Sequence, residues 1–322
     1  MKTKMAVTVL ITLVLISVLA TAFPAGATPT KRRVPEDYAT IQAAVNHANP
    51  GDTIEVHTGT YQETVTIQSD AHDLRLKGEG HPTLMDKPDG SLRYGIDIRG
   101  GAYNIEISGF EITGFDDIED AGIFGRRGIL LGNIAIHNNS IHDNYNGIDI
   151  GAASGLFPPG HSKLHISHNE IYMNLDTGIY LLRISDSTID HNEICGNTVG
   201  ISLRMASDLT IDHNEVLNNH RFGIRWADVD NTRLSHNKIE ESGNDGVRIV
   251  GTNTGNTIEH NKVMCNTGSG IHLMDSTQNN ALEYNHASGN GNGSSTKDIW
   301  CEPSVGPNTW KKNKYETATA LL

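Results

Sequence analysis

Residues 186–206 read Asp-Ser-Thr-Ile-Asp-His-Asn-Glu-Ile-Cys-Gly-Asn-Thr-Val-Gly-Ile-Ser-Leu-Arg-Met-Ala, and this stretch decides the fold because it is one unit of a repeat. Its Thr-Ile-Asp-His-Asn-Glu segment returns in closely similar form at Thr210–Val216, Arg233–Ile239 and Thr257–Val263. An earlier copy spans Ser162–Tyr172, with His-Asn at its centre. A unit that returns at a steady interval indicates a solenoid.

Three columns of residues keep the same phase along the chain, and the later copies follow one another at 22 to 24 residues. The first asparagine column is Asn139, Asn169, Asn192, Asn214, Asn237, Asn261 and Asn285. The second, five residues on, is Asn144, Asn174, Asn197, Asn219, Asn266 and Asn290, with Ser242 as the exception. A glycine column follows at Gly147, Gly178, Gly200, Gly223, Gly246 and Gly270. Three columns in phase identify the register of the repeat.

The apolar residues within a unit predict strands. Ile189, Ile194, Ile201 and Leu203 stand in short alternating runs, and alternation of period two is typical of strands. Asn and Gly lie between the runs and tolerate the positive φ of sharp turns. Each unit is therefore expected to form three short strands, one coil of a parallel β-helix. Coils stack at roughly 4.8 Å, so equivalent asparagines should form hydrogen-bonded ladders.

The repeated Ile-x-His-Asn-x-Ile pattern, followed by Gly-Ile, resembles that of right-handed parallel β-helix proteins of the pectin-lyase-like superfamily. Within it, the chain is similar to the β-helix repeat group that includes NosD-like periplasmic proteins and carbohydrate-binding or sugar-hydrolase domains. The resemblance covers about Lys31 to Asn290. It implies an all-β, right-handed β-helix and a polysaccharide partner. The architecture hosts lyases, hydrolases, epimerases, esterases and non-catalytic binders, so the resemblance leaves the activity open.

The N-terminus has the pattern of a secretory signal peptide over residues 1–27. Lys2 and Lys4 precede an apolar run at Ala6–Ala20, and small residues follow. This predicts a secreted, periplasmic or cell-surface protein with no stable membrane insertion after cleavage. The alternative is an N-terminal membrane anchor, for which the run is short.

The remaining chain is expected to divide into three parts of one elongated domain. Residues 31–90 form an N-terminal cap and the first coils, residues 91–290 the regular repeats, and residues 291–322 a C-terminal cap. The first part contains a predicted helix at Asp37–Asn49, which has one apolar face and is placed to cover the open end of the solenoid. Further coils are expected at Tyr94–Ile98 and Asn104–Ile112.

Charge and cysteine content restrict the partners. The 25 Lys and Arg against 38 Asp and Glu give a net charge of −13, which disfavours nucleic-acid binding. The same charge repels an acidic glycan unless basic residues gather locally. Cys195 and Cys265 lie three coils apart, too far for a disulfide, whereas Cys265 and Cys301 pair only if the C-terminal tail folds back.

The strand that begins at each column glycine has a readable outer side, and this side carries the candidate site. Its outward residues run from Asp97 and Asp149 through Tyr180 to Arg225, Arg248 and His272, with Arg204 one outward position further along its strand. Two departures from the period, Asp116–Arg127 and Gly151–Ser162, flank this side. Loops beside a rigid face are frequent places for sites.

We assign catalytic candidates and substrate-binding candidates to this side. The catalytic set is Asp149, Tyr180, Arg204 and Asp97. The substrate-binding set is Arg183, Arg225, Arg248 and His272. Arginine binds a uronate carboxylate bidentately, tyrosine or arginine transfers a proton, and aspartates can hold Ca²⁺. The set suits β-elimination or C5 epimerisation of an acidic sugar. The alternative is a structural surface solenoid with solvated charge ladders.

Family signatures leave the enzyme class open between lyase, hydrolase and epimerase. The Asp pairs, Gly-His-Gly and Arg-Ile-Lys of polygalacturonases are absent from the sequence. The run Tyr94-Gly-Ile-Asp97 is similar to the Tyr-Gly-x-Asp-Pro-His run of alginate epimerases, but Ile98-Arg99 replaces Pro-His.

A histidine column is the last distinctive pattern. It comprises His168, His191, His213, His236 and His260, beside Asp190, Asp212 and Glu259. Because the column follows the structural period, we interpret it as stacked turn residues and assign no metal ligand. The alternative is a Zn²⁺ or Cu²⁺ site, and the NosD-like resemblance then implies an accessory protein for copper.

Overall fold

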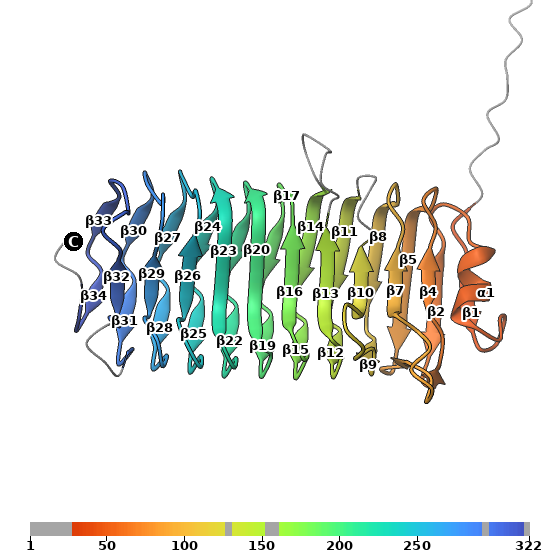
Figure 1. Ribbon diagram of the computed structural model, residues 1–322. Helices are drawn as coiled ribbons and strands as arrows, with labels where there is room; N and C mark the ends of the chain where they lie inside the picture. Colours follow the sequence, from red (N-terminus) through yellow and green to blue (C-terminus); the bar gives the residue numbers. More distant parts are fainter. Residues whose placement is uncertain (1–27, 126–130, 152–160, 292–295, 319–322) are drawn as a thin grey trace, which may run out of the picture.

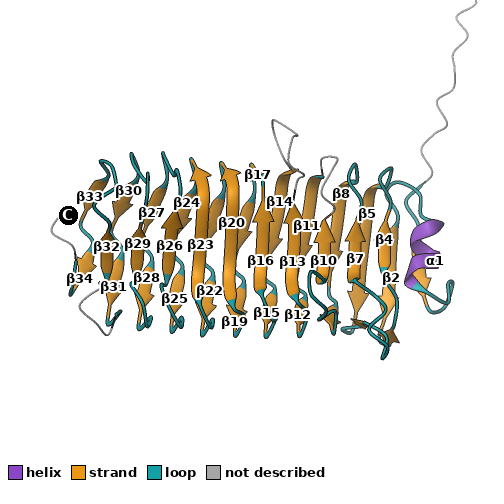
Figure 2. Cartoon of the chain, viewed as in Figure 1, coloured by secondary structure: helices purple, strands orange, loops and turns teal. Residues whose placement is uncertain are grey.

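Short parallel strands make up nearly all the regular structure of the computed structural model, which describes residues 28–125, 131–151, 161–291 and 296–318. The strands pair in two sheets, of 23 and 11 strands, and successive coils stack into one elongated body (Figure 1). Figure 2 shows that strands and turns alternate along the whole stack, with a single short helix at one end. The chain is an all-β, right-handed parallel β-helix, as the repeat and the resemblance predict.

Each regular coil places one strand on each of three faces. The front face, nearest the viewer in Figure 1, comprises β4 (Val65–Ile67), β7 (Tyr94–Ile98), β10 (Ala121–Gly125), β13 (Asn146–Gly151), β16 (Thr177–Leu182), β20 (Val199–Ser207), β23 (Phe222–Asp230), β26 (Val247–Val250), β29 (Ile271–Leu273) and β32 (Ile299–Cys301). The rear face comprises β1 (Lys31–Val34), β2 (Thr53–His57), β5 (His72–Glu79), β8 (Tyr103–Ser108), β11 (Gly132–His137), β14 (His161–Ser167), β17 (Ile184–Ser185), β18 (Thr188–Asp190), β21 (Thr210–Asp212), β24 (Arg233–Ser235), β27 (Thr257–Glu259), β30 (Ala281–Glu283) and β33 (Thr309–Lys311). The lower face comprises β3 (Thr60–Tyr61), β6 (Thr83–Met85), β9 (Glu111–Thr113), β12 (Ser140–His142), β15 (Glu170–Tyr172), β19 (Glu193–Cys195), β22 (Glu215–Leu217), β25 (Lys238–Glu240), β28 (Lys262–Met264), β31 (His286–Ser288) and β34 (Lys314–Tyr315).

The core is a set of aliphatic columns along the axis of the stack. On the front face, Ile148, Ile179, Ile201 and Ile224 pair in direct register from coil to coil, and all four are fully buried. Burial of each such side chain contributes about 2 kcal/mol. The alternation seen in the sequence therefore describes the inner side of the front face correctly.

The first asparagine ladder forms as predicted and continues to Asn313. At Asn192, the side-chain amide donates to Asn214 Oδ1 at 2.9 Å and to the Ile166 carbonyl at 2.9 Å. Asn192 Oδ1 accepts from the side-chain amide and the backbone N–H of Asn169, both at 3.0 Å. The ladder thus satisfies the polar groups of a turn that is closed to water.

The second asparagine ladder has the same bonds and one interruption. Asn197 donates to Asn219 Oδ1 at 3.2 Å, and Asn266 donates to Asn290 Oδ1 at 2.8 Å. Between them stands Ser242, whose buried hydroxyl has no hydrogen-bond partner. Its backbone N–H still donates to Asn266 Oδ1 at 2.9 Å. The ladder therefore lacks one side-chain rung.

The expectation that the column asparagines and glycines supply the positive φ is wrong. The left-handed residue is the one before the asparagine, as at His191 (φ 55°) and His213 (φ 54°). This placement turns the chain one residue earlier and leaves the asparagine side chain directed into the ladder. The column glycines serve close packing instead: a Cβ on Gly200 would lie 2.6 Å from both the Gly223 carbonyl oxygen and Val216 Cγ1.

The N-terminal end is covered by a helix that is shorter than predicted. The helix α1 spans Ile41–Asn46 rather than Asp37–Asn49, because residues 35–37 form a turn and Thr40 caps the helix by accepting from the Ala43 N–H at 3.1 Å. Its buried residues Ile41, Ala44 and Val45 pack on the end of the core.

Two other segments differ in detail from the expectation. The segment Asn104–Ile112, expected to be part of a further coil, contributes to two strands, β8 and β9, which are separated at Gly109, where φ is 80°. The described part of residues 291–322 continues the repeat, since β32, β33 and β34 pair with β29, β30 and β31.

The signal-peptide prediction falls on residues 1–27, which lie outside the described residues. Within the described chain, no helix has the length and hydropathy that a membrane span requires. The register places Cys195 and Cys265 three coils apart, and no disulfide joins Cys265 to Cys301, both of which are described.

Candidate functional site

The outer side of the front face is one continuous column in strand register. In order along the stack it reads Thr66, Asp97, Phe124, Asp149, Tyr180, Ser202, Arg225, Arg248, His272 and Trp300. We call this the front column. Carboxylates occupy one part of it and cations another, whereas the inner side of the same strands is mainly aliphatic, with Trp226 as the one aromatic residue among those described.

Several members of the front column are buried, although the alternation predicted a solvated outer surface. Asp97, Asp149 and His272 are 2%, 6% and 4% exposed. Asp97 forms an ion pair with Arg99 at 3.0 Å, measured from Oδ2 to Nε. The interpretation of these three side chains as freely solvated charge ladders is wrong, because all three are buried. Buried charges need close partners.

A cavity of about 400 Å³ opens on the front face over four successive coils. It brings together Asp149 and Tyr180, which are direct neighbours in the front column. The complete lining is Arg93, Tyr94, Glu119, Phe124, Tyr145, Asn146, Asp149, Asp176 and Tyr180. Carboxylates, aromatic rings and one arginine thus surround a space large enough for a sugar residue.

The turns that enter the front face fix two walls of the cavity. The Tyr145 N–H donates to the Phe115 carbonyl at 2.7 Å, and the Asp176 N–H donates to the Tyr145 carbonyl at 2.8 Å. The Asn146 side chain accepts from the Thr177 N–H at 3.1 Å. Equivalent turn residues are therefore stacked one coil apart, which places the Tyr145 and Asp176 side chains beside Tyr180.

The opposite wall is aromatic and is flanked by a cation. The rings of Tyr94 and Phe124 stack at 4.2 Å, and the Arg93 guanidinium lies 5.4 Å from the Tyr94 ring centre. Arg93 also forms an ion pair with Asp120 at 3.0 Å, which raises the pKa of the guanidinium. Stacked rings of this kind offer an apolar surface that fits the face of a pyranose.

Two acidic groups of the cavity have raised pKa values. Burial raises the pKa of the Asp176 carboxyl, although a hydrogen bond from Thr177 and the charge of Arg221 act in the opposite direction. Burial, together with the charges of Asp176 and Glu119, raises the pKa of the Tyr145 phenol. Asp176 thus retains its proton to higher pH than a solvated aspartate, as a general acid requires.

Next to the cavity, the front face carries a group of four arginines, Arg204, Arg221, Arg225 and Arg248, which we call the arginine cluster. Burial lowers the pKa of Arg225, and repulsion from the other three adds to this effect, while the Tyr180 phenol opposes it. Arg221 and Arg248 lie 4.8 Å and 5.0 Å from the centre of the Phe222 ring. The mutual repulsion indicates a local excess of positive charge that is suited to binding an anion.

Near the far end of the front column, the buried side chain of His272 lies between two carboxylates. His272 Nδ1 lies 3.0 Å from Asp245 Oδ2, and His272 Nε2 lies 3.3 Å from Glu302 Oε1. Asp245 also pairs with Arg248 at 3.0 Å, and the Trp300 ring stacks on His272 at 4.3 Å. Hydrogen bonds from His272 and Ser269 outweigh burial and lower the pKa of Asp245.

The predicted site residues do not all meet. The structure brings Asp149 and Tyr180 together in the cavity, with Arg225, Arg248 and His272 further along the column. Arg204, which is in register with Leu182, belongs to the arginine cluster near Arg225. The remaining two lie apart from the cavity: Asp97 is separated from Asp149 by Phe124, and Arg183 is a left-handed turn residue. The roles assigned to all eight residues stay predictions.

Several cavity residues are absent from the sequence prediction, namely Arg93, Glu119, Tyr145 and Asp176. Tyr145 directly follows Asn144 of the second asparagine column, and Asp176 stands two residues after Asn174 of the same column. The register of the repeat could therefore have located both. Glu119 belongs to the first predicted insertion. Most of the second insertion, and Arg126-Arg127 in the first, lie outside the described residues. The carboxylates of Asp149, Asp176 and Glu119 are the cavity groups that could hold Ca²⁺.

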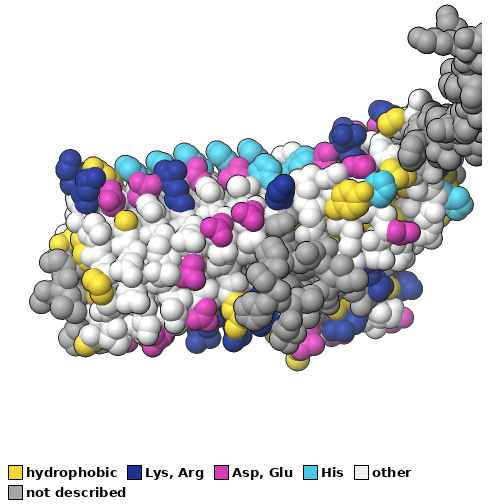
Figure 3. All heavy atoms as spheres, turned by 90° about the horizontal axis from the view of Figure 1, so that it is seen from above, with side chains coloured by type: hydrophobic (Ala, Val, Ile, Leu, Met, Phe, Trp, Pro, Cys, Tyr) yellow, Lys and Arg dark blue, Asp and Glu magenta, His cyan; other side chains and the backbone are white. Residues whose placement is uncertain are grey.

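The histidine column forms the predicted stack along the edge between the rear and lower faces, and Figure 3 shows histidines in a row on the surface. The rings of His168, His191, His213, His236 and His260 follow one another at 4.9 to 5.1 Å and are nearly parallel. Tyr284 continues the stack beyond His260 at 4.9 Å. The predicted ring-on-ring stacking of the column is confirmed.

Comparison with known proteins identifies the repeat. The family model described as right handed beta helix region matches residues 87–224 and 160–309. No curated protein matches the sequence.

Three solved structures are similar to the whole described stack. The A-module of the mannuronan C-5 epimerase AlgE4 from Azotobacter vinelandii aligns with a TM-score of 0.59 at 15% identity, over 90% of this chain and 99% of that one. A complex of XylC with xylose gives 0.62 at 16% identity, over 81% and 69%. Pectate lyase Pel9A gives 0.53 at 14% identity, over 92% and 80%. At these identities the likeness shows the fold alone.

Proposed function

The chain belongs to the right-handed β-helix region family, and from this premise we propose that it binds an acidic polysaccharide along the front face and acts on it in the cavity. One observation carries the proposal: a cavity lined by carboxylates and tyrosines adjoins four arginines on the same face of an otherwise acidic chain. The similarity to an epimerase of mannuronan and to a pectate lyase supports it, because both polymers are built of uronates.

The arginine cluster would bind the uronate carboxylates. Arg225 lies two coils from Tyr180 in the front column, with only Ser202 between them. Coils repeat at roughly 4.8 Å, so the two backbones lie roughly 10 Å apart, and the side chains of Arg225 and Tyr180 are close enough to interact electrostatically. A carboxylate held by Arg225 loses negative charge, which acidifies the hydrogen on the adjacent C5 carbon.

The cavity would then supply proton transfer. Tyr180 removes the C5 hydrogen as a proton, and the electron pair passes to the carboxylate that Arg225 neutralises. In β-elimination, a C4–C5 double bond forms, the C4–O bond breaks, and the protonated Asp176 gives its proton to the leaving oxygen. In C5 epimerisation, a second proton, supplied by water, is instead delivered to C5 from the opposite side of the ring, and no bond between sugars breaks. Asp149 and Glu119 would orient the sugar or hold Ca²⁺.

Secretion or export to the periplasm is part of the proposal, since polysaccharides of this kind lie outside the cytoplasm. The signal-peptide pattern of residues 1–27 supports it.

The test is a panel of acidic and neutral polysaccharides incubated with the mature protein, with and without Ca²⁺. Absorbance of unsaturated uronates reports β-elimination, reducing ends report hydrolysis, and deuterium uptake at C5 in heavy water reports epimerisation. Tyr180→Phe should abolish the signal, and Arg225→Gln should weaken substrate binding at least tenfold. Arg233→Gln, an exposed rear-face arginine paired with Glu259, is the matched control and should change neither.

Retardation of the protein by polyuronates in an affinity gel, without any chemical signal, would restrict the function to binding. The absence of both chemistry and retardation would contradict the proposal and favour a structural solenoid.

A further inference from the structure

We propose that Asp212, His213 and His236 form a binding site for a divalent transition-metal ion such as Zn²⁺. The site lies at the edge between the rear and lower faces, so it is independent of the cavity and of the function proposed for the front face. The imidazole nitrogens and carboxylate oxygens of these residues are the ligands that such ions prefer.

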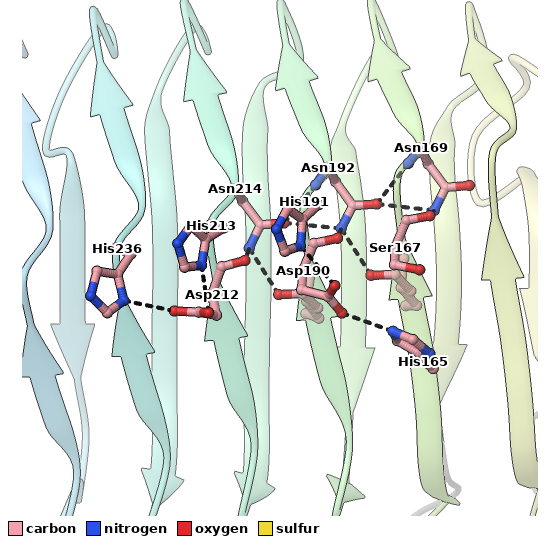
Figure 4. A network of polar contacts seen from close by, with 12 residues as sticks. His165, Ser167, Asn169, Asp190, His191, Asn192, Asp212, His213, Asn214 and His236 are labelled. Carbon is pink, nitrogen blue, oxygen red and sulfur yellow. Dashed lines mark hydrogen bonds and ion pairs between the residues drawn. The ribbon is translucent and has the colours of Figure 1, made fainter.

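The three side chains converge from two neighbouring coils, as Figure 4 shows. His213 Nδ1 lies 2.6 Å from one oxygen of Asp212, and His236 Nδ1 lies 3.1 Å from the other. Each residue offers a ligand atom, and these atoms all lie within 4.8 Å of one another. Within the part of the chain that the structure describes, this is the one group of three such residues that converge so closely.

A break in the repeat creates this convergence. The rear-face ladder that contains Asp212 reads Asp190, Asp212, Ser235 and Glu259 in register. His191, His213 and His260 each contact the carboxylate beside them on their own coil. His236 follows Ser235 and turns to Asp212 of the preceding coil instead. One carboxylate therefore serves two histidines through Nδ1.

The site is accessible and held in place. The side chains of His213 and His236 are 50% and 41% exposed, so an ion can reach them from solvent. Their rings stack at 4.9 Å, between His191 on one side and His260 on the other. Ser235 Oγ donates to Asp212 Oδ1 at 2.5 Å. These contacts restrict the rotation of the ligands, which is what outer partners do in metal sites.

The distances suit a tetrahedral ion after a small adjustment. Zn²⁺ binds nitrogen and oxygen at about 2.1 Å, which separates two tetrahedral ligand atoms by roughly 3.4 Å. The His213–Asp212 distance of 2.6 Å must lengthen by about 0.8 Å and the His236–Asp212 distance of 3.1 Å by about 0.3 Å, and water supplies the fourth ligand. The ion takes the place of the Nδ1 protons that the imidazoles share with Asp212: a neutral imidazole then carries its proton on Nε2, whereas a doubly protonated imidazole releases one proton to solvent. Hydrogen bonds from Ser235 and the two histidines outweigh burial and lower the pKa of Asp212 to about 2, so the carboxylate is ionised at neutral pH.

The experiment titrates ZnCl₂ into mature protein that carries no histidine tag and has been freed of metal with a chelator. Calorimetry should show one saturable site, with more proton release at pH 6.5 than at pH 8. Asp212→Asn and His236→Phe should each weaken binding at least tenfold, and the phenylalanine keeps the ring stack. The matched controls, Asp190→Asn and His191→Phe, alter the same ladder and the same stack one coil away and should bind Zn²⁺ like the wild type.

Thermal unfolding of every variant without metal identifies any that fail to fold, and visible absorbance of bound Co²⁺ gives a second measure of ligand number and geometry. A wild-type protein that takes up no Zn²⁺ would overturn the proposal. So would folded Asp212→Asn and His236→Phe variants with undiminished affinity, or an equal loss in the two controls, which would indicate diffuse binding along the whole histidine stack.

Discussion

The inner asparagine ladders and the front column run along the same coils, but the ladders repeat one residue type whereas the front column does not. In the first inner ladder the same residue, asparagine, stands at every described coil from Asn139 to Asn313, and each makes the same bonds. In the front column almost every coil has a different residue, from Asp97 through Tyr180 to Trp300. The repeat is kept where the coil must close, and it is abandoned on the outer side of the front face, where we propose that a polysaccharide binds.

This difference gives a way to separate structural from functional residues in a solenoid. A buried polar residue that recurs with the period satisfies its neighbours, and its loss affects several coils. A polar residue that breaks the period contributes little to the stack, so its presence needs another explanation. Tyr180 in the front column and Ser235 beside the histidine stack are such breaks.

The largest expected effect tests the inner ladder. Asn192→Ala removes two donated bonds and leaves the N–H and side-chain amide of Asn169 without their acceptor in a buried turn. We expect a loss of about 3 kcal/mol in the free energy of unfolding, measured by denaturant titration. Glu193→Ala changes the exposed next residue and should cost less than about 0.5 kcal/mol. Equal losses in the free energy of unfolding for Asn192→Ala and Glu193→Ala would contradict the distinction between ladder residues and exposed residues.

The next effect concerns acid stability at the histidine stack. The pKa of Asp212 is lowered to about 2, so the carboxylate contributes stability above the pKa of the unfolded chain, near 3.9. That contribution is lost as pH falls from about 4 toward 2. Asp212→Asn should therefore cost about 1 kcal/mol at pH 6, after allowance for solvent screening, and little at pH 2. Melting curves at the two pH values measure this, and a loss that is independent of pH would contradict it.

A smaller effect, of opposite sign, comes from repairing the interrupted ladder. Ser242→Asn should restore the missing rung, because Asn219 and Asn266 stand in place on either side. We expect a gain of about 1 kcal/mol in the free energy of unfolding. Ser242→Ala controls for loss of the unpartnered hydroxyl and should be nearly neutral. A destabilised asparagine variant would show that this coil differs in shape from its neighbours.

The smallest expected effect belongs to the front column. Tyr180→Phe keeps the ring and removes only the phenol oxygen that faces the cavity. The free energy of unfolding should change by less than about 0.5 kcal/mol, even though the variant loses the proposed chemistry. Thermal unfolding beside the polysaccharide assay measures both. A large loss of stability would move Tyr180 from the functional to the structural class.

The sequence predicts the fold well because the buried residues recur with the period of the coil. The asparagine ladders, the inner isoleucines and most of the front column follow from spacing alone, although Phe124 between Asp97 and Asp149 is not predicted. Turn geometry is predicted less well, since the left-handed φ falls on His191 and not on Asn192. The helix was predicted too long because apolar periodicity does not reveal the turn at residues 35–37.

The site is predicted only in part. Spacing places Asp149 beside Tyr180. It does not show how far neighbouring residues cover an outward side chain, so the burial of Asp97 and Asp149 is not foreseen. The cavity also depends on turn residues such as Tyr145 and Asp176, which lie in the turns just before β13 and β16. At the histidine stack, the sequence interpretation assigns no metal ligand, because the sharing of Asp212 by two histidines depends on side-chain directions.

The stacking of coils through register alone has a mechanical consequence. A regular interior coil is hydrogen-bonded only to the coil before it and the coil after it. Tension applied to the two ends of the chain would therefore peel the stack from a terminus, one coil at a time, instead of shearing the whole body at once. Each released coil of 22 to 24 residues would add roughly 80 Å of extended chain. The molecule would therefore lengthen in nearly equal steps, one for each coil that is released.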